Sequence, residues 1–446
     1  MQQGPAIESQ QQHRRTLRRA FTASLVGTSL EWYDFALYGA ATAVVFSKLF
    51  FPGDDPAMAM IKAFLTYAAG YISRPIGGFI FGRLGDRIGR KKVLLWTLML
   101  IGGATVCIGL LPTYSTAGLW APILLVALRF LQGVGVGGEW GGAVLLSSEF
   151  GKPSERGFWA SAAQIGVPVG SVLANLVMLI LSAALPASSF LAWGWRLAFI
   201  LASVIIAFGV WLRLRLEETP VFQRLVERGE TPKEPISEVF RTQGRALLGA
   251  ILSRVGPDVL YAFFAVFVIV WLQQGPGKLS ASQALTCTMI GGAVQIITMP
   301  VAGWISDRVN RKLLYAAGAV GGAVWMFVFV GITQQRSFTV GLIGVVIGLF
   351  FHSIMYAPQA AHVAEQFHAR LRYTGSSLTY TIAGVIGGGF APTALAWLYF
   401  QDRNGVLMAG YIALAVVVTL IGLAMGRRVV DDVDVEAVES TKAVVV

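Results

Sequence analysis

Residues 82–91 read Gly-Arg-Leu-Gly-Asp-Arg-Ile-Gly-Arg-Lys, and a similar stretch, Gly-Trp-Ile-Ser-Asp-Arg-Val-Asn-Arg-Lys, occupies residues 303–312. Each stretch lies between two long apolar segments. Glycine permits a tight connection between helices, and the aspartate with its flanking cations can form charge-assisted hydrogen bonds at helix ends. Because the stretch recurs in the second half, we predict that the chain is built from two related units.

A second pair of landmarks supports the duplication. Glu149 and Arg156 follow the fourth apolar segment, and Glu365 and Arg372 follow the tenth. In carriers made of two such units the substrate binds between the halves, near the middle of the membrane. The predicted parts are an N-terminal tail, a six-helix bundle, a central loop, a second six-helix bundle and a C-terminal tail, at residues 1–19, 20–212, 213–245, 246–426 and 427–446.

The composition places the chain in lipid. Of 446 residues, 55% are hydrophobic and 13% are charged, which is far more apolar than a water-soluble domain needs. A helix crosses the membrane in about 20 apolar residues. We therefore predict an all-α integral membrane protein with twelve transmembrane helices, near residues 22–47, 58–81, 93–111, 119–147, 158–184, 193–212, 247–272, 283–305, 313–333, 338–363, 374–399 and 406–425.

The positive charge indicates membrane topology. The net charge is +11, which suggests nucleic-acid binding, but most Lys and Arg residues fall in alternate loops and at the ends. That asymmetry orients membrane helices, and it predicts a multi-pass inner-membrane protein with both termini in the cytoplasm. The first apolar segment has no small-residue cleavage site, so it is predicted to remain as an anchor. Cys107 and Cys287 have no metal-site or disulfide spacing.

Charged residues within the apolar segments are the candidates for function. Glu31, Asp34 and Tyr38 lie on one face of the first helix, and Arg129 and Gln132 begin the same spacing in the fourth. Val136 and Glu139 continue it along the same face. Each such charge costs about 2.5–3.5 kcal/mol on insertion scales, so it is expected to face a partner or a cavity. A buried ion pair that only sets helix register is the alternative interpretation.

Several motifs together resemble a known family. The 82–91 stretch is similar to the signature loop of the major facilitator superfamily, and Glu31-Trp32-Tyr33-Asp34-Phe35 with Glu218-Thr219-Pro220-x-Phe222 resembles its metabolite:proton symporters. Arg74-Pro75-x-Gly77-Gly78 and Arg129-Phe130-Leu131-Gln132-Gly133 extend the match. That family carries shikimate, 2-oxoglutarate, citrate, dicarboxylates, proline and betaine.

The resemblance implies a mechanism. In related sugar carriers a first-helix aspartate and a fourth-helix arginine couple protons, and Asp34 and Arg129 look like their counterparts, with Glu31 and Glu139 as alternative proton carriers. We expect a monomeric symporter of a small polar metabolite, most plausibly an organic acid, driven by the proton gradient without a cofactor. A zwitterion carrier, with Trp32, Tyr33 and Phe35 around the ammonium group, is the alternative.

Other polar residues within the spans are predicted to line the substrate site, although helix packing is an alternative role for most of them. Arg74 has a second interpretation as the partner of Glu31 or Glu139, and Asp258 lies one helical turn from Arg254. The substrate-binding candidates are Tyr33, Tyr38, Arg74, Gln132, Gln164, Arg254, Tyr261, Gln295, Gln359 and Tyr380.

The repeated loop residues are predicted to form a cytoplasmic gate that holds the two halves together in one conformation. Topology alone would explain the cations, but not the recurring Gly-x-x-x-Asp spacing. The gate candidates are Gly82, Asp86, Arg87, Arg90, Glu149, Arg156, Asp307, Arg308, Arg311, Glu365 and Arg372.

Other functions have weaker support. Gly133-x-Gly135-x-x-Gly138 matches a dinucleotide fingerprint, but it lies inside an apolar helix with no strand before it. His352 and His362 are better explained as packed histidines than as ligands, and no metal site is predicted. A membrane enzyme would need a nucleophile and a base at one depth, and a sensor that transports nothing is the remaining class.

Overall fold

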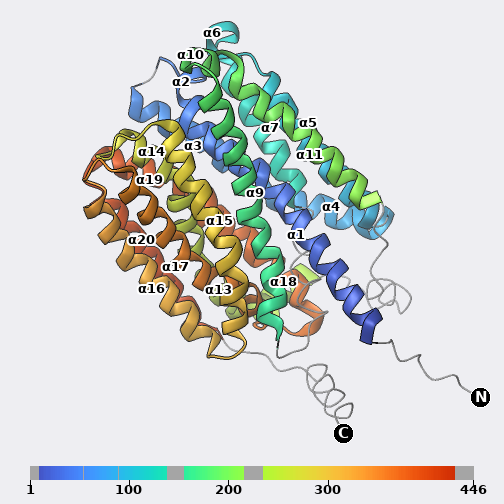
Figure 1. Ribbon diagram of the computed structural model, residues 1–446. Helices are drawn as coiled ribbons and strands as arrows, with labels where there is room; N and C mark the ends of the chain where they lie inside the picture. Colours follow the sequence, from blue (N-terminus) through green and yellow to red (C-terminus); the bar gives the residue numbers. More distant parts are fainter. Residues whose placement is uncertain (1–9, 54, 89, 138–154, 215–234, 427–446) are drawn as a thin grey trace, which may run out of the picture.

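The computed structural model describes residues 10–53, 55–88, 90–137, 155–214 and 235–426, and these are all helix, turn or short connection, without a strand. Within these ranges nine helical segments are long and apolar enough to cross a membrane, and Leu95–Leu110 forms a shorter apolar helix. The prediction of an all-α membrane fold is confirmed (Figure 1).

The helices of the first half follow the predicted spans, with short π-helical segments (η) inside two of them. Span two is divided at Ser73. The bounds are α1 (Gln10–Ala41), η1 (Thr42–Phe46), α2 (Ser47–Leu49), α3 (Pro56–Ile72), α4 (Arg74–Ile88), α5 (Arg90–Leu110), α6 (Tyr114–Ala117), α7 (Trp120–Gly137), α9 (Arg156–Ala184), α10 (Ala187–Ser189), η3 (Phe190–Gly194) and α11 (Trp195–Leu214).

The second half continues in the same way. Local signals set its boundaries: the side chains of Ser280, Asn310 and Ser337 each accept a backbone N–H at a helix start. The bounds are α13 (Pro235–Tyr261), η4 (Ala262–Phe267), α14 (Val268–Gln274), α15 (Ala281–Ser306), α16 (Arg311–Ile332), α17 (Phe338–Ala364), α18 (Ala369–Ala383), η5 (Gly384–Gly389), α19 (Ala391–Gln401) and α20 (Val406–Met425).

One expectation is corrected. Residues 235–245 were predicted to belong to a polar loop, but they are the first part of α13, interrupted by non-helical angles at Gln243. Pro235 suits the first turn of a helix because its fixed φ is already helical. A polar helical segment therefore precedes the membrane-spanning part of α13.

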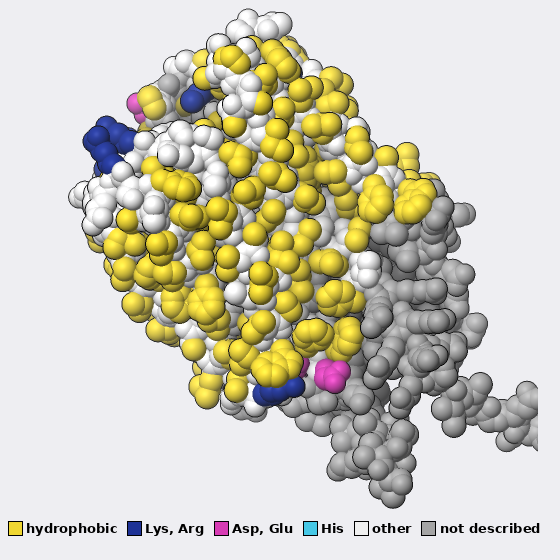
Figure 2. Space-filling model, in the orientation of Figure 1, with side chains coloured by type: hydrophobic (Ala, Val, Ile, Leu, Met, Phe, Trp, Pro, Cys, Tyr) yellow, Lys and Arg dark blue, Asp and Glu magenta, His cyan; other side chains and the backbone are white. Residues whose placement is uncertain are grey.

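The helices of the first half lie together, and those of the second half lie beside them (Figure 1). Between the two groups, α9 packs against α15 and α17, α3 packs against η5 and α19, and α1 contacts η4. Figure 2 shows hydrophobic side chains over most of the visible face, as expected for a surface in contact with lipid.

Glycines allow α7 to pack closely against α3 and α4. A Cβ atom added at Gly133 would lie 1.9 Å from the backbone oxygen of Gly70, and one added at Gly77 would lie 1.9 Å from that of Val134. Small residues at such spacing let membrane helices approach until their backbones touch. Gly133, part of the apparent dinucleotide fingerprint, thus has a packing role.

We expect Gly133→Ala to destabilise the protein, because the added methyl group meets the rigid backbone of Gly70 as well as Ser73 Oγ, at 2.0 Å. Overpacking of this kind costs about 1–3 kcal/mol or more. The unfolding midpoint in detergent measures it. Gly103→Ala is the matched control, since a Cβ there meets nothing within 4 Å. Equal midpoints for the two variants would contradict the packing role of Gly133.

Candidate functional site

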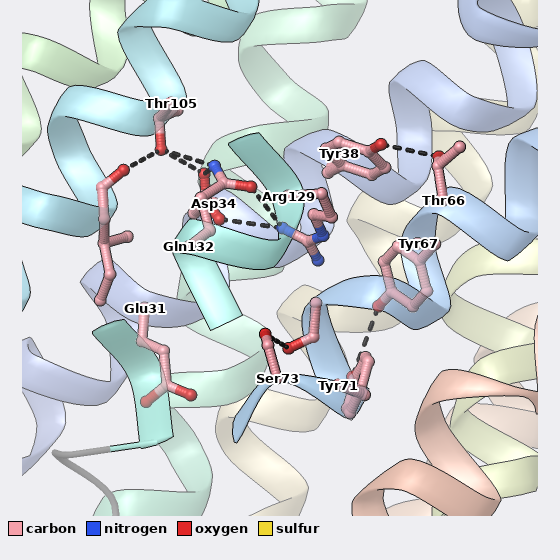
Figure 3. Close-up of polar contacts among 12 residues, drawn as sticks. Glu31, Asp34, Tyr38, Thr66, Tyr67, Tyr71, Ser73, Thr105, Arg129 and Gln132 are labelled. Atoms are coloured by element: carbon pink, nitrogen blue, oxygen red, sulfur yellow. Dashed lines mark hydrogen bonds and ion pairs between the residues drawn. The ribbon is translucent and has the colours of Figure 1, made fainter. Parts of the chain in front are cut away.

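Asp34 is the centre of a buried polar cluster in the first half of the chain. Its carboxylate accepts hydrogen bonds from Thr105 at 2.5 Å, from Gln132 at 2.7 Å and from Arg129 at 3.1 Å. Three helices therefore converge on one carboxylate: α1, α5 and α7 (Figure 3). Asp34 is 3% exposed, so the cation and the two neutral donors replace the water that its charge would otherwise need.

Arg129 is fully buried and held by aromatic rings. Its guanidinium carbon lies 3.9 Å from the centre of the Phe35 ring and 4.3 Å from that of Tyr38. A Cβ atom added at Gly70 would lie 2.7 Å from Arg129 Nε. The glycine of α3 thus leaves the space that the guanidinium occupies. Burial against rings also strengthens the cation–π attraction.

Glu31 lies one turn before Asp34 and apart from the Asp34 cluster (Figure 3). Its carboxylate is 3.9 Å from Arg74 Nη2, which is too long for a hydrogen bond. Both carboxylates line one small crevice, together with Tyr33, Thr105 and apolar residues of α1, α5 and α11. Glu139 lies outside the described residues.

A pocket lies between the two halves. Residues from α1, α3, α4 and α9 meet residues from α13, η4, α17 and η5 there, and we call this the central pocket. Its lining residues are Trp32, Tyr67, Tyr71, Arg74, Val167, Arg254, Asp258, Tyr261, Ala262, Val266, His352, Tyr356 and Gly388.

Arg74 brings a positive charge to the central pocket from the first half. Its guanidinium carbon lies 4.1 Å from the Tyr71 ring centre and 4.4 Å from that of Phe35. Within the part of the chain that the structure describes, its Nε and Nη2 are buried and have no hydrogen-bond partner. The interpretation that Arg74 partners Glu31 is met only at the 3.9 Å distance, and Glu139, the other suggested partner, lies outside the described residues.

Arg254 brings a second guanidinium from the other half. Its Nε donates to Asp258 at 3.1 Å and its Nη1 donates to Gln359 at 3.2 Å. The guanidinium carbon also lies 3.5 Å from the centre of the Tyr380 ring. The expected pair of Arg254 and Asp258, one turn apart, is therefore present. Arg254 is therefore more closely paired than Arg74, whose ion pair with Glu31 is 3.9 Å long.

Of the predicted substrate-binding residues, Arg74, Arg254 and Tyr261 line the central pocket. The others bond between or within helices, which matches the alternative interpretation that they stabilise helix packing. Their contacts are Tyr33 to the Ala198 carbonyl, Tyr38 to Thr66, Gln132 to Asp34, Gln164 to the Tyr356 carbonyl and Tyr380, Gln295 to His352, Gln359 to Arg254, and Tyr380 to Gln164 and the Arg254 guanidinium.

Some site residues escaped the sequence interpretation. Thr105 donates to Asp34, but a threonine in an apolar helix carries no signal of such a role. Tyr67 and Tyr71 line the central pocket, as does His352, which the sequence suggested was merely packed. Two tyrosines four residues apart share a helix face, and that spacing was the one available signal.

Some of the residues proposed for the gate contact one another. Asp307, at the end of α15, accepts the backbone N–H groups of Gly157 and Phe158 at 2.7 and 2.9 Å. These groups belong to the first turn of α9, whose dipole favours a negative charge. Arg311 bonds to Asp307 at 2.9 Å and also to Glu365. The contact joins the two halves of the chain.

The remaining gate candidates are placed differently. Arg308 lies on its own Trp304 ring, at 3.7 Å, and not in the Asp307 contact. Arg372 is buried and donates to the Phe367 carbonyl, and Arg156 begins α9. The candidates outside the described residues or side chains are Gly82, Asp86, Arg87, Arg90 and Glu149.

Comparison with known proteins agrees with this architecture. A model of the Major Facilitator Superfamily matches residues 25–392. The shikimate transporter of Escherichia coli (strain K12) is 36% identical over 391 residues, covering 86% of this chain and 89% of that protein. The proline/betaine transporter of the same strain is 33% identical over 421 residues, covering 91% and 82%.

Among solved structures, the partially occluded inward-open conformation of the xylose transporter from E. coli has a TM-score of 0.73 at 19% identity, covering 91% of this chain and 97% of that one. At this identity the match shows the fold alone. The sequence matches show more, because they span most of the chain at over 30% identity. This chain belongs to the major facilitator superfamily and is a multi-pass membrane transporter.

Proposed function

We propose that this transporter is a proton-coupled symporter of a small organic acid, acting as a monomer by alternating access in the inner membrane, with both termini in the cytoplasm. One observation carries the substrate class. The central pocket receives a guanidinium from each half of the chain, Arg74 and Arg254, while Asp258 is the one carboxylate among its described lining residues. A site with this charge balance favours an anion.

Arg74 is the residue that supports direct binding of a substrate carboxylate. Its Nε and Nη2 are buried and, among the described residues, have no hydrogen-bond acceptor, and a buried donor without an acceptor is costly. A carboxylate in the central pocket would satisfy both through paired hydrogen bonds. Arg254 already has Asp258 and Gln359 as acceptors, so its charge is expected to contribute mainly through attraction at longer range.

The proton is proposed to bind Asp34. Protonation of the carboxylate oxygen that faces Arg129 would remove the negative charge and break the ion pair at 3.1 Å. Arg129 would then be a buried cation without its counter-charge, which destabilises that arrangement of α1 and α7. The crevice that Glu31 and Asp34 line shares no lining residue with the central pocket.

Phe35 is proposed to couple the two sites. Its ring contacts the guanidinium of Arg129 at 3.9 Å and that of Arg74 at 4.4 Å. Movement of Arg129 after protonation of Asp34 would therefore change the support of Arg74 in the pocket. The residue next to the proton site thus touches both the proton-linked cation and the substrate-linked cation.

Phe35→Leu is expected to reduce proton-driven uptake several-fold while substrate exchange is largely retained. The leucine keeps an apolar side chain but removes two cation–π contacts, each worth about 0.5–2 kcal/mol. Uptake and exchange in proteoliposomes measure the two activities. Phe199→Leu, at another fully buried phenylalanine outside the site, is the control. A parallel loss of both activities would argue against coupling.

The function itself is tested by uptake of labelled organic acids, betaine and proline into proteoliposomes, with and without an imposed inward proton gradient. Gradient-stimulated uptake of an acid would support the proposal. Uptake of an acid at a rate that does not depend on the gradient would support the anion site but contradict the assignment of Asp34 as the proton site. No uptake of any acid would overturn the substrate class.

A zwitterion is the second candidate, and a specific observation favours it. Trp32, Tyr67, Tyr71, Tyr261 and Tyr356 line the same pocket, and aromatic faces bind quaternary ammonium groups. Tyr33, one member of the box that the sequence suggested, bonds instead to the Ala198 carbonyl. Betaine uptake without uptake of any acid in the same panel would select this function.

The Asp307 contact is proposed to be the cytoplasmic gate. It supplies a charged acceptor to the first turn of α9 from the other half, and Arg311 and Glu365 extend the contact. Such a polar network holds one arrangement of the halves and is released when they rock apart.

A further inference from the structure

His352 is a buried side chain of the central pocket that none of the steps above uses. It belongs to α17, is 1% exposed and lines the pocket opposite the helices that carry Arg74. Its ring stacks on Tyr356 with centres 4.8 Å apart and contacts Tyr261 at 5.1 Å. Two aromatic rings therefore limit its rotation, and its polar atoms have a defined direction.

The hydrogen bonds around Gln295 determine which nitrogen of His352 carries the proton. Gln295 Nε2 donates to the Leu349 carbonyl at 3.1 Å and lies 2.8 Å from His352 Nδ1. A flipped amide would place its oxygen against the Leu349 oxygen, which has no proton to donate. The NH2 group of Gln295 therefore donates one hydrogen to the Leu349 carbonyl and the other to His352 Nδ1, which must be the unprotonated nitrogen.

The remaining nitrogen, Nε2, is consequently the protonated one in the neutral ring. It is buried and has no hydrogen-bond partner among the residues that the structure describes. Leaving a buried N–H without an acceptor costs free energy, so its persistence beside a pocket points to an acceptor that arrives with a ligand. Burial among aromatic rings alone would be served equally well by a phenylalanine.

We propose that His352 is a specificity-determining residue whose Nε2–H donates a hydrogen bond to the substrate. This rests on the proposed function and adds a requirement to it. The substrate presents one carboxylate to Arg74 in the first half and a second acceptor oxygen, from a hydroxyl, carbonyl or further carboxylate, to α17 in the second half. Acids with one carboxylate and no other acceptor, such as acetate, lack that second contact.

Two substitutions separate substrate recognition from a structural role. His352→Asn keeps an acceptor near Nδ1 for Gln295, but its shorter side chain places no donor at the Nε2 position, whereas His352→Gln reaches that position with its amide N–H. The probe is the labelled acid of the uptake panel that the wild-type protein accumulates. We expect KM to rise about tenfold in His352→Asn with little change in maximal rate. In His352→Gln we expect KM to return most of the way to the wild-type value.

A purely structural histidine would give the opposite order, because His352→Asn preserves the bond to Gln295 and His352→Gln does not. That order would overturn the proposal. His362→Asn is the matched control: it is another buried histidine of α17 with an unpartnered Nε2, but it lies outside the central pocket, so its KM should not change.

A measurement without transport distinguishes failure of this proposal from failure of the proposed function. Nitrogen NMR of the histidine-labelled protein at neutral pH, assigned by the loss of a signal in His352→Asn, is expected to show His352 as the Nε2–H tautomer. An Nδ1–H tautomer or a doubly protonated ring overturns the proposal even if an acid is transported. The expected tautomer, in a protein that transports no acid, overturns the substrate assignment instead.

Discussion

Asp34→Asn is expected to abolish accumulation of substrate against its gradient, while exchange of substrate across the membrane continues. Asparagine can still accept hydrogen bonds from Thr105 and Gln132 through its amide oxygen, in place of Oδ1, while its NH2 group replaces the Oδ2 atom that pairs with Arg129, so the ion pair is lost as it would be on protonation. It cannot bind and release a proton at physiological pH, and the proton gradient then has no group through which to act. The internal-to-external substrate ratio in proteoliposomes should fall to about one.

Asp402→Asn is a suitable control for that experiment. Asp402 accepts backbone N–H groups in an exposed turn and lies outside both the Asp34 cluster and the central pocket. Its accumulation ratio should match that of the wild-type protein. If the Asp34→Asn carrier still concentrates substrate when a proton gradient is imposed, the pair of Asp34 and Arg129 has only a structural role.

Arg74→Gln is expected to have the second-largest effect, a rise of about 100-fold in the KM for the transported acid. The substitution removes a charge-assisted pair of hydrogen bonds in a buried site, and 100-fold corresponds to about 2.7 kcal/mol. Arg74→Lys should be intermediate, because lysine keeps the charge but not the planar pair of donors. Initial uptake rates over a range of concentrations measure the change.

Arg403→Gln gives the matched loss of charge at an exposed arginine, which lies on the Tyr399 and Phe400 rings. We expect its KM to be unchanged. A KM in Arg74→Gln equal to that of the wild-type protein would show that the substrate carboxylate binds elsewhere, and Arg254 would become the first residue to test.

Much of the fold was predictable because the membrane imposes a simple rule. A span needs about 20 apolar residues in a form that satisfies its own backbone, and α20 lies at 406–425 as its hydropathy indicates. Other boundaries depend on polar signals. The residues before Gln243 are polar enough to resemble a loop, yet they form a helix, because hydropathy does not distinguish a polar helix from a loop.

The candidate site was predictable only where charge and spacing coincide. Asp34 and Arg129 are costly in an apolar helix, so their burial together follows from energetics. Tyr33 and Gln164 are polar without being costly, and they bond to other helices instead of lining the pocket. The sequence provided no means of separating these from Tyr261, which does line it.

By itself, the sequence of this protein determined a duplicated, multi-pass helical carrier with an ion pair inside its first half, because hydropathy, charge asymmetry and a repeated motif are properties of the chain taken one segment at a time. Only the tertiary structure decided that Arg74 faces Arg254 across a pocket, that Phe35 touches two guanidinium groups and that Gln295 sets the tautomer of His352. These contacts depend on the rotation of each helix about its own axis. Apolar groups surround these helices in lipid as well as in the core, so the hydrophobic pattern leaves that rotation undetermined, and packing between helices sets it.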